Sequence, residues 1–198
     1  MSYFEIESPV ESCVEIKKSK FYTHLVPYSD FSNELTKMKE RYVKANHFVY
    51  AYRYLNEFDQ VVENQSDDGE PKGSSGKPTL SVLAGKQLIN TAAITARIFG
   101  GTKLGVGGLV RAYGESVKQS IAIAQLVEFK KLVCFNIECN YSAHAKLKSI
   151  LKLHSANITN SDFNAEHVLL SVSIQEDGAP ILKQELQEFA HGSVKVFK

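Results

Sequence analysis

The sequence lacks the long apolar runs and the paired cysteines that mark whole classes of protein. Its apolar stretches, such as residues 121–124, fall far short of the roughly 20 residues that a membrane-spanning helix needs. Residues 1–13 contain no apolar core of the kind that a secretory signal requires. Three cysteines without regular spacing fit a reducing compartment better than a disulfide scaffold. We therefore expect a soluble globular protein of the cytoplasm, with no membrane partner.

Acidic residues are missing from one long segment, although the chain as a whole is nearly neutral. The 198 residues hold 23 Lys and Arg against 22 Asp and Glu, a net charge of +1. Residues 71–114 contain no Asp or Glu, where the average composition would place about five. The six bases of this segment are Lys72, Lys77, Lys86, Arg97, Lys103 and Arg111, and ten of the twelve glycines fall within residues 69–114. Such a segment attracts polyanions even in a neutral protein, unless it only reflects a region rich in loops.

The first part of the chain mixes predicted strands and helices. Residues 47–55 alternate in the manner of a strand, and residues 32–43 have the apolar spacing of a helix. A strand over 92–99, a glycine-rich loop over 100–108 and a helix over 109–125 follow. These elements predict an α+β domain over residues 1–127.

The remaining residues, 128–198, predict a second domain with a different order of strands and helices. The expected elements are a strand at 128–138, a helix at 142–153, strands at 156–163 and 166–175, a helix at 180–190 and a strand at 193–197. The order βαββαβ is that of the ferredoxin-like sandwich, in which two helices cover one face of a four-stranded sheet.

A first polar loop, residues 66–78, contains three carboxylates in four residues: Asp67, Asp68 and Glu70. Carboxylates so close together are able to hold a hydrated Mg²⁺, and they are also typical of turns that bond their own backbone amides. The loop is not a phosphate-binding P-loop, because Pro71 stands where that motif has glycine. We expect Asp68, Gly69, Glu70 and Pro71 to shape the loop.

The second loop runs from a strand into a helix, which is where free backbone amides form an anion site. Arg97 precedes it, and Lys103 and Arg111 flank it. The dinucleotide fingerprint fails, because Gly105-x-Gly107 is followed by Val110 where the motif needs its third glycine. The glycines either cradle a phosphate or serve only unusual backbone angles, as expected for Gly100 and Gly101.

Other candidate sites are weaker. The aromatic face of the strand at 47–55 is typical of a core packed under a helix, which leaves Arg53, on the opposite face, as the better candidate for contact with a ligand. No nucleophile elbow is present. Cys134, Cys139 and His144 lack a fourth zinc ligand near them in the sequence. We expect no metal, no cofactor and no catalytic residue.

At these two loops the chain resembles the IMPACT family, in its bacterial YigZ-like branch. The matching residues are Ala45-Asn46-His47, Tyr50-Ala51-Tyr52-Arg53, residues 66–71, Gly76-Lys77-Pro78, residues 95–105 and residues 107–113. The resemblance covers residues 15–125 strongly, with one departure at Ile98, where the family has an aromatic residue. It implies a first domain like the second domain of ribosomal protein S5, followed by a ferredoxin-like domain similar to one of elongation factor G. Eukaryotic members are associated with translational control.

The leading interpretation is a non-enzymatic, translation-linked protein that binds RNA or the ribosome through its first domain. The residues expected to contact phosphate are Arg53, Lys77, Arg97, Lys103, Gly107, Gly108 and Arg111. One alternative is a nucleotide- or phosphate-binding enzyme, in which residues 100–108 hold phosphate and Asp67, Asp68 and Glu70 hold Mg²⁺. Another is a protein–protein adaptor whose second domain receives the partner.

Overall fold

A computed structural model describes residues 2–190 and 194–197, which form two compact units, Met1–Phe129 and Lys130–Lys198. Each unit encloses its own hydrophobic core. Among the described residues, every helix is too short or too polar to cross a membrane.

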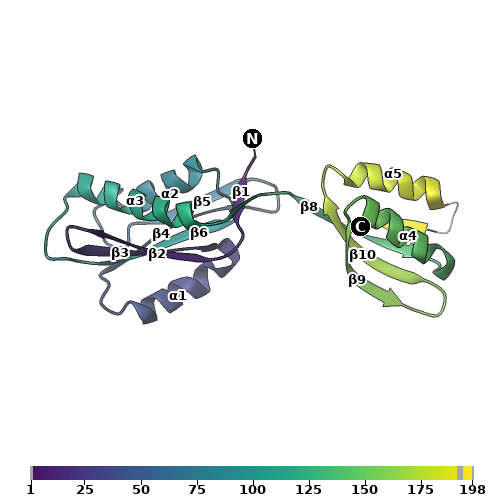
Figure 1. The fold of residues 1–198 in the computed structure, drawn as a ribbon, viewed down its shortest axis with the longest axis horizontal. Helices are drawn as coiled ribbons and strands as arrows, with labels where there is room; N and C mark the ends of the chain where they lie inside the picture. The colour runs from purple at the N-terminus through teal and green to yellow at the C-terminus, as the bar shows by residue number, and fades with distance from the viewer. Residues whose placement is uncertain (1, 191–193, 198) are drawn as a thin grey trace. The chain divides into compact units, whose positions relative to one another are not determined.

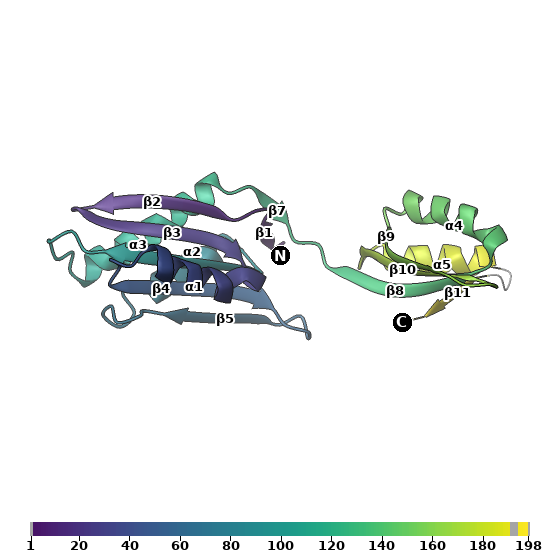
Figure 2. The same cartoon turned by 90° about the horizontal axis from the view of Figure 1, so that it is seen from below.

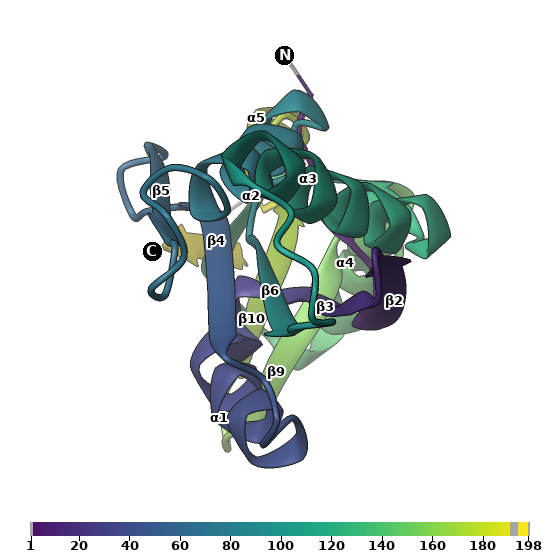
Figure 3. The same ribbon diagram turned by 90° about the vertical axis from the view of Figure 1, so that its left-hand side faces the viewer.

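The first unit is built on a five-stranded antiparallel sheet with helices on both faces (Figures 1 and 3). In sheet order its strands are β2 (Val10–Ile16), β3 (Ser19–Pro27), β6 (Thr91–Ile98), β4 (His47–Leu55) and β5 (Val61–Ser66). Helix α1 (Phe31–Arg41), preceded by the short η1 (Tyr28–Asp30), covers one face. Helices α2 (Gly76–Gly85) and α3 (Val106–Ile123) cover the other. Strand β1 (Phe4–Ile6) pairs with β7 (Leu126–Glu128) beside this sheet.

Burial on both faces explains the composition of the central strands. Strand β6 lies between helices on either side, and seven of its eight residues are buried, which suits its small and β-branched side chains. On β4, Phe48 and Tyr50 pack around Met38 of α1, while Val49 and Ala51 face α2 and α3. The expectation that the aromatic face of this strand is core is confirmed for Phe48 and Tyr50.

The second unit has the ferredoxin-like order β11-β8-β10-β9, with both helices on one face of the sheet (Figure 2). Its elements are β8 (Leu132–Cys139), α4 (Tyr141–Leu153), β9 (Asn157–Phe163), β10 (Val168–Gln175), α5 (Ala179–Ala190) and β11 (Val194–Phe197). The expected α+β class and the βαββαβ order are confirmed. Ser193, where the last strand was expected to begin, lies outside the described residues.

Two elements of the first unit, β5 and α3, differ notably from the sequence-based expectation. Strand β5 was not predicted, because this edge strand carries polar residues without alternation. Helix α3 begins at Val106, so Gly107 and Gly108 lie in its first turn and not in a loop. Their low helix propensity is overridden by the buried apolar side of the helix, which includes Leu109 and Tyr113.

Candidate functional site

Four segments of the first unit meet at one end of its sheet (Figure 3). The strand register places the β2–β3 turn, the end of β6, the start of β4 and the end of β5 side by side. The loops that follow β5 and β6 therefore lie close together, although 33 residues separate Ser66 from Phe99 in the sequence. Glu70 and Pro71 of one loop and Lys103 and Leu104 of the other line the same hollow.

Asp67 organises the first loop from inside. Its carboxylate accepts hydrogen bonds from the amides of Gly73, Ser75 and Gly76 at 2.7, 3.1 and 2.8 Å and from the Ser75 hydroxyl at 2.7 Å. Burial alone would raise the pKa of Asp67, but these four donors outweigh it and hold the pKa below its usual value. The negative charge of Asp67 is therefore stabilised by hydrogen-bond donors of its own loop and holds that loop together.

Asp68 fastens the loop to the start of β4. Its carboxylate accepts a hydrogen bond from the amide of Phe48, and its backbone carbonyl lies 2.7 Å from His47 Nδ1. Because a carbonyl oxygen only accepts, His47 Nδ1 carries the proton and donates. Asp68 and Gly69 both have positive φ, +43° and +85°, which makes this corner of the loop sharp.

Glu70 lies in a buried polar cluster. Its side chain is only 3% exposed, and Oε1 accepts hydrogen bonds from Arg97 Nη1 at 2.7 Å and from the Tyr113 hydroxyl at 2.8 Å. Burial, followed by the neighbouring Glu70 charge, raises the pKa of Tyr113, so this phenol stays protonated and donates. The Arg97 guanidinium also lies over the rings of Phe21 and Phe99.

Two residues that the sequence predicts to contact phosphate, Arg53 and Arg97, form ion pairs within the protein. The buried charge of Arg97 is matched by Glu70. Arg53, expected on an accessible face, is 7% exposed, pairs with Glu63 at 2.7 Å and donates to the carbonyl of Leu88. Its face of β4 lies under α2, so the expectation of a phosphate contact for Arg53 does not fit its burial.

The three carboxylates of the first loop bond three different sets of donors. Within residues 2–190 and 194–197, Asp67, Asp68 and Glu70 do not form a group with metal-ligand spacing. The alternative in which they jointly hold Mg²⁺ therefore receives no support from their geometry.

The second loop is pinned to the β2–β3 turn. A Cβ on Gly100 would lie 2.0 Å from the carbonyl carbon of Lys18, so only glycine permits this approach. The Gly100 amide donates to the Ser19 hydroxyl at 3.1 Å. Gly101 and Gly105 have φ of +88° and +73°, which directs the chain into α3. The packing of Gly100 brings Lys17 and Lys18 next to the glycine-rich loop.

Exposed cations lie before the start of α3 and along the helix. They are Lys17 and Lys18 of the β2–β3 turn, Lys103 before the helix, and Arg111 and Lys118 along it. None of them has an ion-pair partner among the residues that the structure describes. No side chain caps α3, which leaves the first backbone amides, including those of Gly107 and Gly108, pointing out of its positive end.

Two hollows flank this helix start. The Arg97 hollow, of about 570 Å³, has a polar lining of Asn46, His47, Glu70, Arg97 and Lys103. The Arg111 hollow, of about 580 Å³, has charged lining residues Lys17, Glu115, Arg111 and Lys118. Lys103 and Arg111 therefore belong to neighbouring hollows and not to one cleft. Lys77 is exposed at the start of α2 and lines neither hollow.

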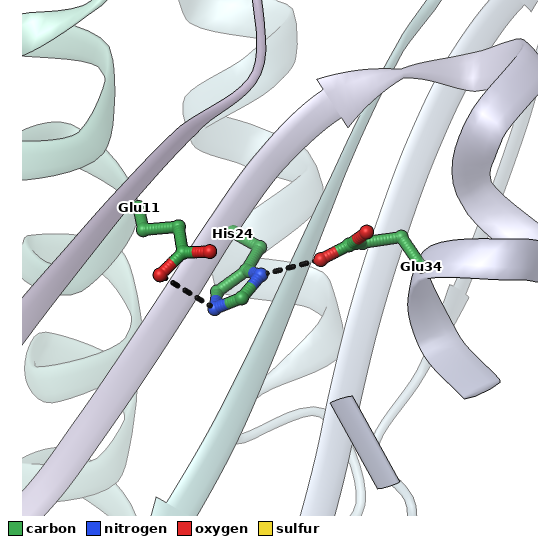
Figure 4. A group of neighbouring side chains, drawn as sticks. All are labelled: Glu11, His24 and Glu34. Carbon is green, nitrogen blue, oxygen red and sulfur yellow. Dashed lines mark hydrogen bonds and ion pairs between the residues drawn. The ribbon is translucent and has the colours of Figure 1, made fainter. Parts of the chain in front are cut away.

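A separate cluster lies on the α1 face of the sheet (Figure 4). His24 Nδ1 is 2.7 Å from Glu34 and Nε2 is 3.6 Å from Glu11, so the ring stands between the two carboxylates. Nε2 is also 3.1 Å from the Tyr42 hydroxyl, and Glu11 forms an ion pair with Arg41. This is the arrangement of an imidazole that bridges β2 and α1, because the two carboxylates face opposite ring nitrogens.

Sequence reasoning missed several residues of the candidate site. His47 stands out in the sequence only as part of a strand and of the family match, and no motif singles out Lys17 and Lys18. The sequence feature that points to these lysines is Gly100. Glycine at this position permits the close approach to the backbone of Lys18. Tyr113 stands out in the sequence only as part of the family match over residues 107–113.

Comparisons with known proteins agree with this organisation. The profile of the Impact N-terminal domain matches residues 17–121, and that of a domain of unknown function, DUF1949, matches residues 137–193. An IMPACT family member of Haemophilus influenzae is 33% identical, covering 92% of this chain and 89% of the relative. YigZ of Escherichia coli, also an IMPACT family member, is 32% identical, covering 96% of this chain and 94% of the relative. A crystal structure of a hypothetical protein is also similar, with 30% sequence identity and a TM-score of 0.72. The match covers 99% of this chain and 96% of the chain in that structure.

Proposed function

Because the chain belongs to the IMPACT family, we propose that it is a translation-linked, non-enzymatic protein that binds the phosphate backbone of RNA, free or in the ribosome. The supporting observation is the group of five exposed cations that lie before the uncapped start of α3 and along the helix: Lys17, Lys18, Lys103, Arg111 and Lys118. Cations without internal partners are the groups that neutralise phosphates and release counterions. The association of eukaryotic family members with translational control fits RNA as the polyanion.

The geometry favours contact with the backbone over the reading of bases. The two hollows both reach Leu104 before α3, and Gly107, which is exposed in the first turn of the helix, has no side chain to obstruct a strand that passes there. The aromatic side chains of β4 that would stack bases are packed against α1 and the ring of Tyr28. We therefore expect binding with little sequence preference.

The test is the salt dependence of RNA affinity. Fluorescence anisotropy with a labelled single-stranded RNA should show association at about 50 mM salt and a linear fall of log affinity with log salt. Replacing both Lys103 and Arg111 with Ala should flatten that slope by about two units, because two phosphate contacts are lost.

The matched control removes two cations from the other side of the sheet. The exposed residues Lys37 and Lys39 of α1 lie on the face opposite α3, and their double replacement by Ala should leave the slope unchanged. An unmodified protein that does not associate with RNA or ribosomes at about 50 mM salt would refute the proposed function.

A further inference from the structure

Arg97, which lines the Arg97 hollow, has a hydrogen-bond donor that the described residues do not use. The Arg97 side chain is 8% exposed, and its Nη1 donates to Glu70. Its Nε is buried and has no partner among the described residues. A buried, unpaired N–H of a charged group is costly and uncommon. A ligand oxygen that reaches Nε from the hollow, through a movement of the side chains that cover it, would satisfy this donor.

The other available groups around the hollow are also mostly donors. Val106 lies on its wall in the first turn of α3, whose amides have no cap, and the exposed Lys103 lies at its rim. The one carboxylate in the wall, that of Glu70, already accepts from Arg97 and Tyr113. A guanidinium N–H, an ammonium group and helix amides together favour an anion.

The shape of the hollow distinguishes between kinds of anion. A strand's internal phosphate diester has two free oxygens and a chain leaving on either side, which fits an open surface. A terminal phosphate monoester has three free oxygens and a single substituent, which fits a hollow. The apolar walls formed by Phe99, Leu104 and Leu109 suit the sugar and base that such a phosphate carries.

We propose that the Arg97 hollow binds a terminal phosphate monoester on a nucleoside, supplied by the 5′ end of an RNA strand or by a free nucleotide. For the first source the inference rests on the proposed RNA binding, and for the second it stands independently. Arg97 Nε, Lys103 and the amides at the start of α3 contact the phosphate oxygens, and Phe99 contacts the nucleoside.

Full-length protein and one RNA sequence, with either a 5′-phosphate or a 5′-hydroxyl, provide the test. At about 50 mM salt the phosphorylated strand should bind about tenfold more tightly, the gain expected of charge-assisted hydrogen bonds to the added phosphate. In a thermal melt, adenosine 5′-monophosphate should stabilise the protein and adenosine should not.

Variants assign the effect to the hollow. Arg97→Lys keeps a positive charge beside Glu70 but removes the Nε donor, and should abolish the preference for the phosphorylated strand. Lys103→Met, at an exposed position, should reduce the preference by at least about threefold and keeps the test valid if Arg97→Lys does not fold. Arg111→Met, in the neighbouring hollow, is the matched control and should weaken both strands equally.

The outcomes separate this inference from the proposed function. Equal affinity for both strands, with no stabilisation by the nucleotide, overturns the inference and leaves RNA backbone binding intact. Stabilisation by the nucleotide without any RNA binding refutes the proposed function and identifies a free nucleotide as the source. A preference that survives in Lys103→Met but disappears in Arg111→Met also overturns the assignment to the Arg97 hollow.

Discussion

Asp67, Asp68 and Glu70 lie within four residues of one another, yet each carboxylate serves a different part of the site. Asp67 holds the amides of its own loop, Asp68 holds the start of β4, and Glu70 holds Arg97 and Tyr113 of β6 and α3. Through Glu70, which bonds both Arg97 of β6 and Tyr113 of α3, this loop therefore links the sheet to α3. A cluster of acids in a sequence does not by itself identify a metal site, because backbone amides and buried cations compete for the same oxygens.

Asp67→Asn should lower the free energy of unfolding by about 2 kcal/mol at pH 7, because a charged acceptor of four hydrogen bonds becomes a neutral one. The native state lowers the pKa of Asp67, so its carboxylate stabilises the fold above the usual aspartate pKa of about 3.9 and loses this effect as pH falls through the lower native value. Urea unfolding of the native sequence should therefore show a steeper loss of stability below pH about 4 than the variant.

The exposed Glu57 provides the control for this experiment. Glu57→Gln should leave both the stability at pH 7 and its decline in acid close to those of the native sequence. Parallel pH profiles for the native sequence and Asp67→Asn would show that Asp67 does not act through its charge.

Burial of individual cations could not be predicted from the sequence. Arg53 and Arg97 occupy inward positions on strands, and each is neutralised by a glutamate, Glu63 or Glu70. Glu63 belongs to β5, a strand that the sequence does not predict because its residues are mostly polar. Glu70 lies 27 residues before Arg97 in the sequence. A count of charges along the chain does not contain these pairings, because tertiary contacts make them.

Helix α3 illustrates the same point at the scale of an element. The alternation of β4 and the helical spacing of residues 109–125 are sufficient to predict both elements, but the predicted helix starts at Leu109 and the observed one at Val106. Gly107 has helical φ, is exposed, and a Cβ there would meet nothing within 4 Å. Neither backbone angle nor packing requires glycine at this position, and the proposed passage of an RNA strand over it would account for the missing side chain.

Gly107→Ala should therefore raise the free energy of unfolding by about 0.5 kcal/mol and lower RNA affinity at least about threefold, because the new methyl group improves helix propensity and obstructs the strand. Chemical unfolding and anisotropy on the same preparation measure the two effects. The matched variant is Gly85→Ala at the end of α2, where a Cβ also meets nothing within 4 Å. It should stabilise without changing affinity, and equal affinities for both variants would contradict a role of Gly107 in binding.

For the whole molecule, charge is separated within the first unit and not between the two units. Residues 71–114 carry six bases and no acid, and every one of the five cations around α3 belongs to Met1–Phe129. The fold of the second unit could be predicted from its clean alternation of strands and helices. Its role could not, because a ferredoxin-like fold serves many functions.

Separate expression of residues 1–129 and 130–198 should assign binding to one unit. Each unit has its own core, so we expect each to fold, which far-UV circular dichroism and a cooperative melt check. Residues 1–129 should retain the RNA affinity and salt slope of the full chain within about twofold, and residues 130–198 should not bind RNA. RNA binding by residues 130–198 alone would move the interface away from α3, whereas binding of a protein partner by them would support an adaptor function.

The contact between Gly100 and Lys18 has a thermodynamic consequence for any ligand at the start of α3. Because the backbone of Gly100 lies directly on that of the β2–β3 turn, the start of the glycine-rich loop is held by the sheet before a ligand arrives. Little conformational entropy then remains to be lost when an anion binds. At residue 100, glycine therefore serves to fix the loop to the sheet and not to make it flexible.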